Sequence, residues 1–268
     1  MADTHPDNGS TYRLGVVSFL NARPLIQGLD RRPDISLLFD VPARLPELLD
    51  REEVHSALVP VIDLVQPDRR WKIISNACIG CDGETLTVRV FSRVPPGEIE
   101  HLHVDGDSHT SVALAQVVWQ ERFGRRLRVT PFTPTTDHDD CQAILLIGDK
   151  VVSHTLTDFD IQTDLGGAWK SLTGLPFVFA VWAAREESAE GHLSAILSAA
   201  RDAGIAHARR IATDTGPGLG WPVELACRYL THRLRFTLSA AHRQGMELFF
   251  RMVREQNLVP GMRQQVFA

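Results

Sequence analysis

Two turns in the sequence place small polar side chains where a helix is expected to start and where an anion can bind. Ser108, Thr110 and Ser111 stand at the head of an apolar helical segment, and Ser18 and Asn21 follow the first expected strand. Free backbone N–H groups and the positive end of the helix dipole attract a carboxylate at such positions, and side-chain donors add to them. The same residue types also serve as ordinary helix caps. One such turn in each half of the chain would hold both ends of a dianion.

A third set of polar side chains lies on an expected strand over residues 85–92. Polar and apolar residues alternate there, which puts Thr85 and Thr87 on one polar face. Arg23 and Arg44 are candidate cationic partners of an anion, although a surface or interlobe salt bridge is the better explanation of each.

Motifs for metals, cofactors or nucleophiles are weak. Cys78 and Cys81 have C-x-x-C spacing, but zinc needs two more ligands at suitable spacing, and the other two cysteines stand alone. His101 and His103 would share one face of a strand without a third ligand. We therefore expect no metal and no cofactor. Because no acid–base pair is evident either, positioning and electrostatics would have to supply most of the rate.

Short apolar runs alternate with amphipathic segments, which predicts an α/β fold with largely parallel sheets. The expected strands cover 12–17, 35–39, 57–59, 71–75, 85–92, 101–104, 127–132, 143–147 and 176–183. The expected helices cover 42–49, 110–123, 165–172, 186–204, 222–233 and 239–255, and Asn21 is expected to cap another before Pro24. Gly148 and Asp149 end one strand and would cap a short helix.

The series after the break at Pro95-Pro96-Gly97 predicts a second lobe inserted into the first. Residues 12–92 and 177–268 would form lobe 1, residues 93–176 lobe 2, and residues 1–11 a disordered tail. The two strands that cross between the lobes would act as a hinge, and the cleft between lobes becomes the expected ligand site.

Composition limits the classes of function. The chain has 268 residues, 44% of them hydrophobic and 23% charged, with a net charge of −5, so binding to nucleic acid is not expected. No run approaches the roughly 20 apolar residues that cross a membrane. The polar N-terminus resembles no secretory signal, which predicts a cytoplasmic location. The oligomeric state is left open.

Several ordered motifs resemble the MqnA family, the chorismate dehydratases of the futalosine route to menaquinone. They lie at 17–25, 38–42, 57–61, 78–83, 110–114, 145–149 and 173–183, and the resemblance runs from about residue 12 to about residue 255. It implies a type II periplasmic-binding-protein-like fold of two α/β lobes. It also implies a cofactor-independent hydro-lyase that removes water from chorismate to give 3-[(1-carboxyvinyl)oxy]benzoate.

The resemblance also assigns roles at matching positions. Asn21 resembles the active-site asparagine of the family, and Thr87 lies where the family commonly has a serine. Both are predicted to be catalytic. The predicted substrate-binding residues are Ser18, Thr85, Ser108, Thr110, Ser111 and Asp149. Two departures are Ala22, where threonine is common, and Glu84, where proline is common and where a negative charge would oppose a dianion.

Because no protein base is evident, the hypothesis is that the enolpyruvyl carboxylate of chorismate takes the C3 proton. Three alternatives remain: a solute-binding protein of the same fold, a ligand sensor, and the related pathway lyase that forms 1,4-dihydroxy-6-naphthoate. That lyase is expected to use a histidine base, and no histidine here lies in a recognisable cleft motif.

Overall fold

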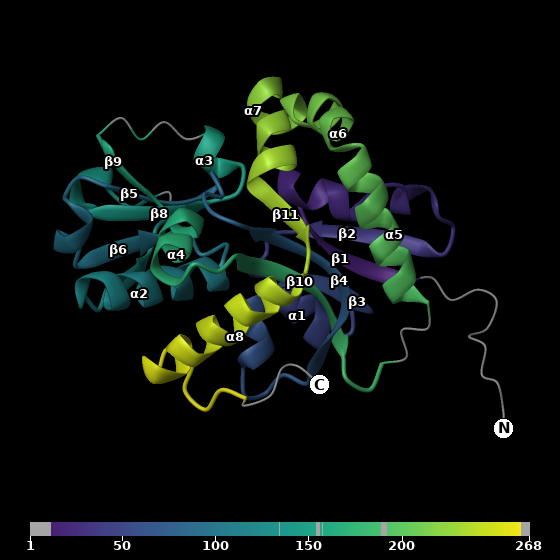
Figure 1. Cartoon of the computed structure of the whole chain (residues 1–268), viewed down its shortest axis with the longest axis horizontal. Helices are drawn as coiled ribbons and strands as arrows, with labels where there is room; N and C mark the ends of the chain where they lie inside the picture. Colours follow the sequence, from purple (N-terminus) through teal and green to yellow (C-terminus); the bar gives the residue numbers. More distant parts are fainter. Residues whose placement is uncertain (1–11, 134, 154–155, 157, 189–191, 264–268) are drawn as a thin grey trace.

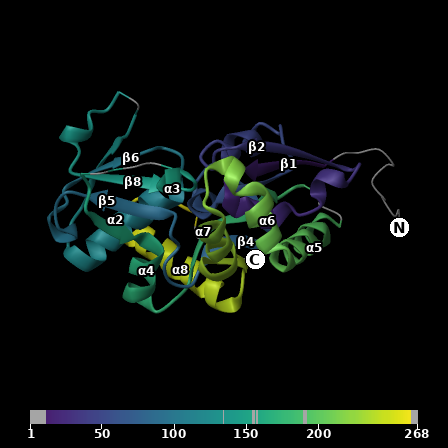
Figure 2. The ribbon, with the colours of Figure 1, turned by 90° about the horizontal axis from the view of Figure 1, so that it is seen from above.

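The computed structural model describes residues 12–133, 135–153, 156, 158–188 and 192–263. The tail expected over residues 1–11 lies outside the described residues. Two lobes stand side by side, each built around one sheet (Figure 1). Figure 2 shows the same two lobes from above, with α7 (Val223–Arg228) lying between them.

The first sheet has six strands in the order β11-β4-β10-β3-β1-β2. They are β1 (Tyr12–Val17), β2 (Ile35–Asp40), β3 (Ser56–Pro60), β4 (Trp71–Cys81), β10 (Phe177–Arg185) and β11 (Leu234–Thr237). β1 runs parallel to β2 and β3, whereas β10 pairs antiparallel with both β3 and β4. In the parallel strands β1 and β3, residues 14–17 and 56–60 are all buried and nearly all apolar, as expected of strands covered on both faces.

The second sheet has five strands in the order β7-β6-β8-β5-β9. They are β5 (Val88–Ser92), β6 (His101–Val104), β7 (Arg128–Pro131), β8 (Ala143–Ile147) and β9 (Ile161–Asp164). β6 runs parallel to β7 and β8, and β5 pairs antiparallel with β8 and β9. The observed β1, β6 and β8 have the predicted bounds.

Helices flank the two sheets. Besides α7 they are α1 (Leu45–Asp50), α2 (His109–Phe123), α3 (Lys150–Ser153), α4 (Leu165–Thr173), α5 (Leu193–Ala206), α6 (Ala208–Thr215) and α8 (Ala240–Glu255). Short 3-10 turns include η1 (Leu20–Ile26) and η3 (Val61–Val65), and a single π turn, Tyr229–Arg233, continues α7. None of the helices among the described residues is both long and apolar enough to cross a membrane.

The chain passes from the first sheet to the second between Cys81 and Val88 and returns between Thr173 and Phe177. The predicted boundary at residue 92 is therefore wrong, because β5 belongs to the second sheet. The strand expected from residue 85 begins only at Val88. Leu86 has a positive φ of 74°, and the N–H groups of Thr85 and Leu86 donate to the side-chain carboxylate of Asp164 rather than to a backbone carbonyl of a neighbouring strand.

Other differences concern element ends. The helix expected over 186–204 begins at Leu193, and β10 extends to Arg185 instead. The helix expected over 222–233 ends in the π turn, whose five residues are wound more loosely than an α-helix. β9, β11 and α6 were not predicted; β9 and β11 are runs of only four residues, too short to show a clear period.

Candidate active site

A cavity lies between the two lobes. Its walls are largely apolar, with side chains from Val17, Phe19, Ile79, Ile147, Phe179 and Leu234. Its polar lining consists of Asn21, Thr85, Thr87, Ser108, Ser111 and Tyr229. The mixture of apolar walls with a few polar groups is typical of a small-molecule site.

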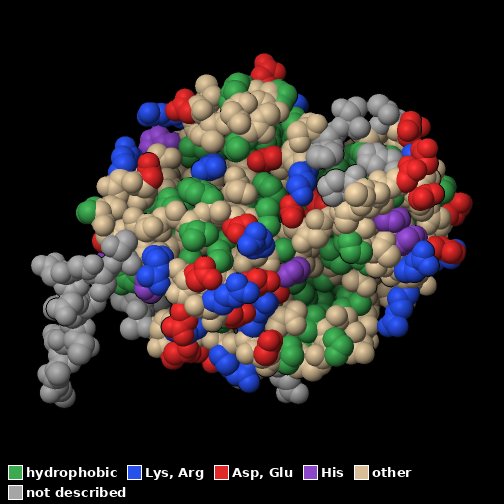
Figure 3. All heavy atoms as spheres, turned by 180° about the vertical axis from the view of Figure 1, so that it is seen from behind, with side chains coloured by type: hydrophobic (Ala, Val, Ile, Leu, Met, Phe, Trp, Pro, Cys, Tyr) green, Lys and Arg blue, Asp and Glu red, His purple; other side chains and the backbone are tan. Residues whose placement is uncertain are grey.

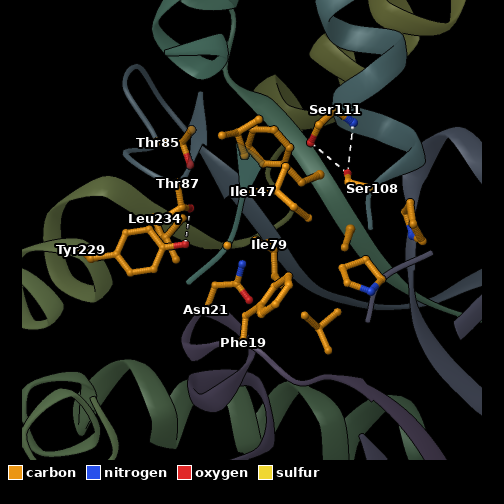
Figure 4. A pocket seen from close by; sticks show the side chains of 17 residues that line it. Phe19, Asn21, Ile79, Thr85, Thr87, Ser108, Ser111, Ile147, Tyr229 and Leu234 are labelled. Carbon is orange, nitrogen blue, oxygen red and sulfur yellow. Dashed lines mark hydrogen bonds between the residues drawn. The ribbon is translucent and has the colours of Figure 1, made fainter. Parts of the chain in front are cut away.

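At one end of the cavity, three polar side chains from different parts of the chain lie together (Figure 4). The Thr87 Oγ1 and Tyr229 Oη atoms are 2.7 Å apart and hydrogen-bonded, and both residues are about 1% exposed. Asn21 lies beside this pair, and its Oδ1 atom is buried without a hydrogen-bond partner among the described residues. A buried amide oxygen without a partner is costly, so it points to a ligand with a donor group.

The ring of Tyr229 is held from outside the cavity. Trp221 stacks on it with ring centroids 4.7 Å apart and an interplanar angle of 16°. Burial raises the pKa of Tyr229, while hydrogen bonds with the side chains of Thr87 and Asn21 act in the opposite direction. The phenol therefore stays protonated near neutral pH.

At the other end of the cavity, the first turn of α2 presents two serine hydroxyls. Ser108 is the N-cap residue: its Oγ accepts the N–H of Ser111 at 3.2 Å and donates to Ser111 Oγ at 2.9 Å. Ser108 and Ser111 lie across the cavity from Asn21, Thr87 and Tyr229 (Figure 4). The helix start and the two hydroxyls together suit a carboxylate.

Three of the predicted binding residues are not among those lining the cavity. Thr110 is fully buried, donates its hydroxyl to Phe179 O at 3.2 Å and accepts the N–H of Ile62. The N–H of Ser18 donates to Asp40 O, so this residue extends the β1–β2 pairing. Both residues support the walls, and the third, Asp149, joins the lobes.

Asp149 follows β8 of the second lobe, but its carboxylate accepts two donors from the first lobe. The Leu20 N–H lies 3.2 Å from each oxygen, and Trp221 Nε1 lies 2.9 Å from Oδ1. Burial raises the pKa of Asp149, and these two hydrogen bonds and the charge of Arg23 oppose that rise. The side chain of Asp149, expected to cap the short helix that follows β8, instead caps the start of η1 in the other lobe.

The capping role predicted for Asn21 is wrong. η1 begins at Leu20 with Phe19 as its N-cap residue, and no side chain of that position caps it. Because Asp149 satisfies the first N–H of η1, the amide of Asn21 is left to face the cavity.

Tyr229 is the one titratable side chain among the described residues that line the cavity. Glu84 instead pairs with Arg233 at 2.9 Å, with both side chains about half exposed. Arg44 pairs with Asp40, and Arg23 lies over the ring of Phe39. The negative charge of Glu84, which was expected to oppose a dianion, is therefore paired with Arg233 outside the cavity lining.

The cysteine pair forms no metal centre. Cys78 and Cys81 are fully buried free thiols, and burial raises the pKa of Cys78 to about 12 and raises that of Cys81 as well. Within the described part of the chain, no three histidine, cysteine or acidic side chains gather as a metal site. His101 instead contacts Thr130 through Nε2 at 2.8 Å.

A second contact between the lobes lies beside Ser108. His109 Nδ1 is 2.9 Å from Asp63 Oδ2, and Arg69 pairs with the same buried carboxylate.

Acidic and basic side chains gather near the middle of the rear face, beside an apolar hollow (Figure 3). The two signs are interspersed on this face, as expected of a chain with a small net charge.

Sequence reasoning missed Tyr229 and Trp221. Tyr229 lies 142 residues beyond Thr87 in the sequence. It falls within the helix predicted over residues 222–233, with no signal that marks it as part of a site. Their spacing of eight residues carries no recognised motif, so only the fold brings them to the cavity.

Solved structures share this architecture. A protein from Archaeoglobus fulgidus superposes with a TM-score of 0.74 at 12% identity, covering 94% of this chain and 100% of that one. The periplasmic aliphatic sulphonate binding protein SsuA from Escherichia coli superposes with a TM-score of 0.62 at 16% identity, covering 97% of this chain and 98% of that one. The two lobes and the cavity between them define a protein with the periplasmic-binding-protein-like fold, as predicted.

Sequence comparison narrows this class. The family model described as menaquinone biosynthesis matches residues 12–255, and the chain belongs to that family. The chorismate dehydratase of Thermus thermophilus is 28% identical over 260 residues, which cover 89% of this chain and 93% of that protein. The predicted family is confirmed.

Proposed function

We propose that the protein is a chorismate dehydratase that converts chorismate into 3-[(1-carboxyvinyl)oxy]benzoate. The observation that carries this proposal is a cavity with hydrogen-bonding groups at two opposite ends and no titratable lining side chain other than Tyr229 among the described residues. Family membership and the named relative support it.

The two ends of the cavity suit the two ends of the chorismate ring. The C1 carboxylate would accept hydrogen bonds from Ser108, Ser111 and the free N–H groups of α2. The C4 hydroxyl is para to that carboxylate, so it would lie at the opposite end beside Asn21 and Thr87. The unpartnered Oδ1 of Asn21 would then accept the hydrogen of the C4 hydroxyl.

Removal of the C3 proton places negative charge on the ring and, through the adjacent double bond, on the C1 carboxylate. The start of α2 would stabilise that charge as it develops. Because the described lining offers no carboxylate or histidine, the enolpyruvyl carboxylate of the substrate is the base in this proposal. Loss of the C4 hydroxyl completes an aromatic ring, which provides a large driving force. The reaction has no net redox change, so we propose no cofactor, and a cytoplasmic location for this biosynthetic step.

One alternative fits the cavity less well, and the others differ from the proposal in turnover. A lyase with a histidine base needs a histidine at the substrate, and the described lining has none. A solute-binding protein or a sensor would bind its ligand without turnover.

The test is incubation of the purified protein with chorismate, followed by absorbance and product mass. We expect the wild-type protein to form a product lighter than chorismate by one water. We expect the Asn21→Ala variant to form this product far more slowly. Tight binding of chorismate without any product would contradict the proposal and favour a binding protein.

A further inference from the structure

The departing hydroxyl poses a problem that the substrate carboxylate does not solve alone. Hydroxide is a poor leaving group, so its departure is faster when a proton reaches the oxygen as the C4–O bond breaks. The end of the cavity assigned to the C4 hydroxyl contains one phenol, that of Tyr229, which is hydrogen-bonded to Thr87 at 2.7 Å.

The position of this phenol is fixed from three sides. Thr87, on the crossover into the second lobe, holds the hydroxyl, and Trp221 stacks on the ring. Trp221 is in turn held through Nε1 by Asp149 of the second lobe at 2.9 Å. Thr87 and Asp149 lie on the crossover and in the second lobe, so the placement of the phenol depends on contacts between the lobes.

We propose that Tyr229 is a catalytic residue, the proton donor to the departing C4 hydroxyl of chorismate. This inference rests on the proposed function. The single π turn supports it, because such turns recur at functional sites and this one carries Tyr229 as its first residue.

The protons and electrons balance without a co-reactant. The C3–H bond breaks, its proton goes to the enolpyruvyl carboxylate, and its electron pair enters the ring. The C4–O bond breaks with its pair on oxygen, and that oxygen takes the Tyr229 proton to become water. The phenolate regains a proton from the enolpyruvyl carboxylic acid, directly or through the Thr87 hydroxyl. One water leaves for each chorismate, and the enzyme is unchanged.

The environment of Tyr229 keeps the donor loaded. Burial raises its pKa, so the phenol is protonated throughout the neutral range. A phenol remains a stronger acid than water, so it can still protonate a departing hydroxide.

The first experiment compares Tyr229→Phe with the wild type. The ring and its stack on Trp221 are kept, and only the hydroxyl is lost. We expect kcat to fall about 100-fold or more, the range of general acid catalysis, with the Kd for 3-[(1-carboxyvinyl)oxy]benzoate changed by less than about threefold. Tyr12→Phe, at the start of β1 and outside the cavity lining, is the matched control and should retain wild-type kcat.

The second experiment detects contact between Tyr229 and the bound product in the absence of turnover. The chain has two tyrosines, so incorporation of 3-fluorotyrosine gives two ¹⁹F resonances, and Tyr229→Phe identifies which is which. Addition of 3-[(1-carboxyvinyl)oxy]benzoate should shift the Tyr229 resonance and leave that of Tyr12 in place.

Two kinetic results overturn the inference in a protein that dehydrates chorismate. One is a Tyr229→Phe kcat within about threefold of wild type, and the other is an equal loss in kcat and product affinity, which would mark a structural role. An unshifted Tyr229 resonance in saturated protein also overturns it. Absence of product from the wild type contradicts the proposed function instead.

Discussion

Asp149 gives the sharpest test of how the closed cavity is held, because one side chain joins three segments. Its Oδ1 accepts Trp221 Nε1 at 2.9 Å, and both oxygens lie 3.2 Å from the Leu20 N–H. Leu20 is fully buried and Trp221 is 2% exposed, so water does not readily replace the lost acceptor. The change to test is Asp149→Ala.

The magnitude follows from the two donors that this change leaves unpaired. Each buried unsatisfied donor costs about 1–3 kcal/mol. The two share one acceptor, and the mutation also removes a carboxylate whose burial is unfavourable, as its raised pKa shows. We therefore expect Asp149→Ala to lower the free energy of unfolding by about 2–4 kcal/mol, below the sum of the two parts.

Asp149→Asn is the matched control, because it keeps an acceptor oxygen at the Oδ1 position, which both donors contact, while it loses the charge and replaces Oδ2 by an amide nitrogen. Urea unfolding followed by tryptophan fluorescence measures both variants. We expect the asparagine variant to lose about 1 kcal/mol or less. If the alanine variant is as stable as the wild type, or if both variants lose the same amount, the interlobe cap described above does not hold the lobes together.

Three further changes test other parts of the site. Gly148→Ala would place a Cβ 2.4 Å from Phe19 Cδ2 at a φ of 62°. We expect about a 100-fold loss of kcat/KM, because the Phe19 side chain that lines the cavity would be displaced. Near-normal kinetics would contradict the close approach of the lobes at this position. His109 has a pKa raised chiefly by its hydrogen bond to Asp63, while partial burial and Arg69 lower it and Glu47 raises it. A raised folded-state pKa stabilises the fold at pH values below the ordinary pKa of 6.5, and that contribution is lost as the pH rises through the folded-state pKa. The free energy of unfolding should therefore fall more steeply above pH 6.5 in the wild type than in His109→Gln. Equal slopes would refute this. Asn21→Asp should place a carboxylate at the cavity end and lower kcat at least about 100-fold with an unchanged unfolding midpoint, whereas wild-type turnover would remove Asn21 from the reaction.

The apolar strands were predictable because each is a short buried run ended by a turn signal. β1, β6 and β8 have the predicted bounds, since few residues at their ends admit another conformation. The start of α2 was also predictable, because Ser108 followed by an apolar helical run is a strong capping signal. The capping signal placed the cavity end at Ser108 and Ser111. At the other end, Asn21 and Thr87 were assigned roles through the family resemblance, because the helix cap and the strand expected there do not form.

What the sequence did not reveal depends on contacts between distant segments. The positive φ of Leu86 and the carboxylate of Asp164 end the strand early, and neither shows in an alternating pattern. Asp149 caps a helix 129 residues away, which no local rule for caps considers. Tyr229 reaches the cavity through a π turn, and hydrophobic periodicity does not distinguish that turn from an α-helix.

A crystal structure of the protein with bound 3-[(1-carboxyvinyl)oxy]benzoate tests the central claim most directly, because the claim is an orientation. The account predicts the ring carboxylate at Ser108 and Ser111 and the C4 edge of the ring against Asn21, Thr87 and Tyr229. A product bound with its ring carboxylate at Tyr229, or bound outside the cavity between the lobes, would contradict it.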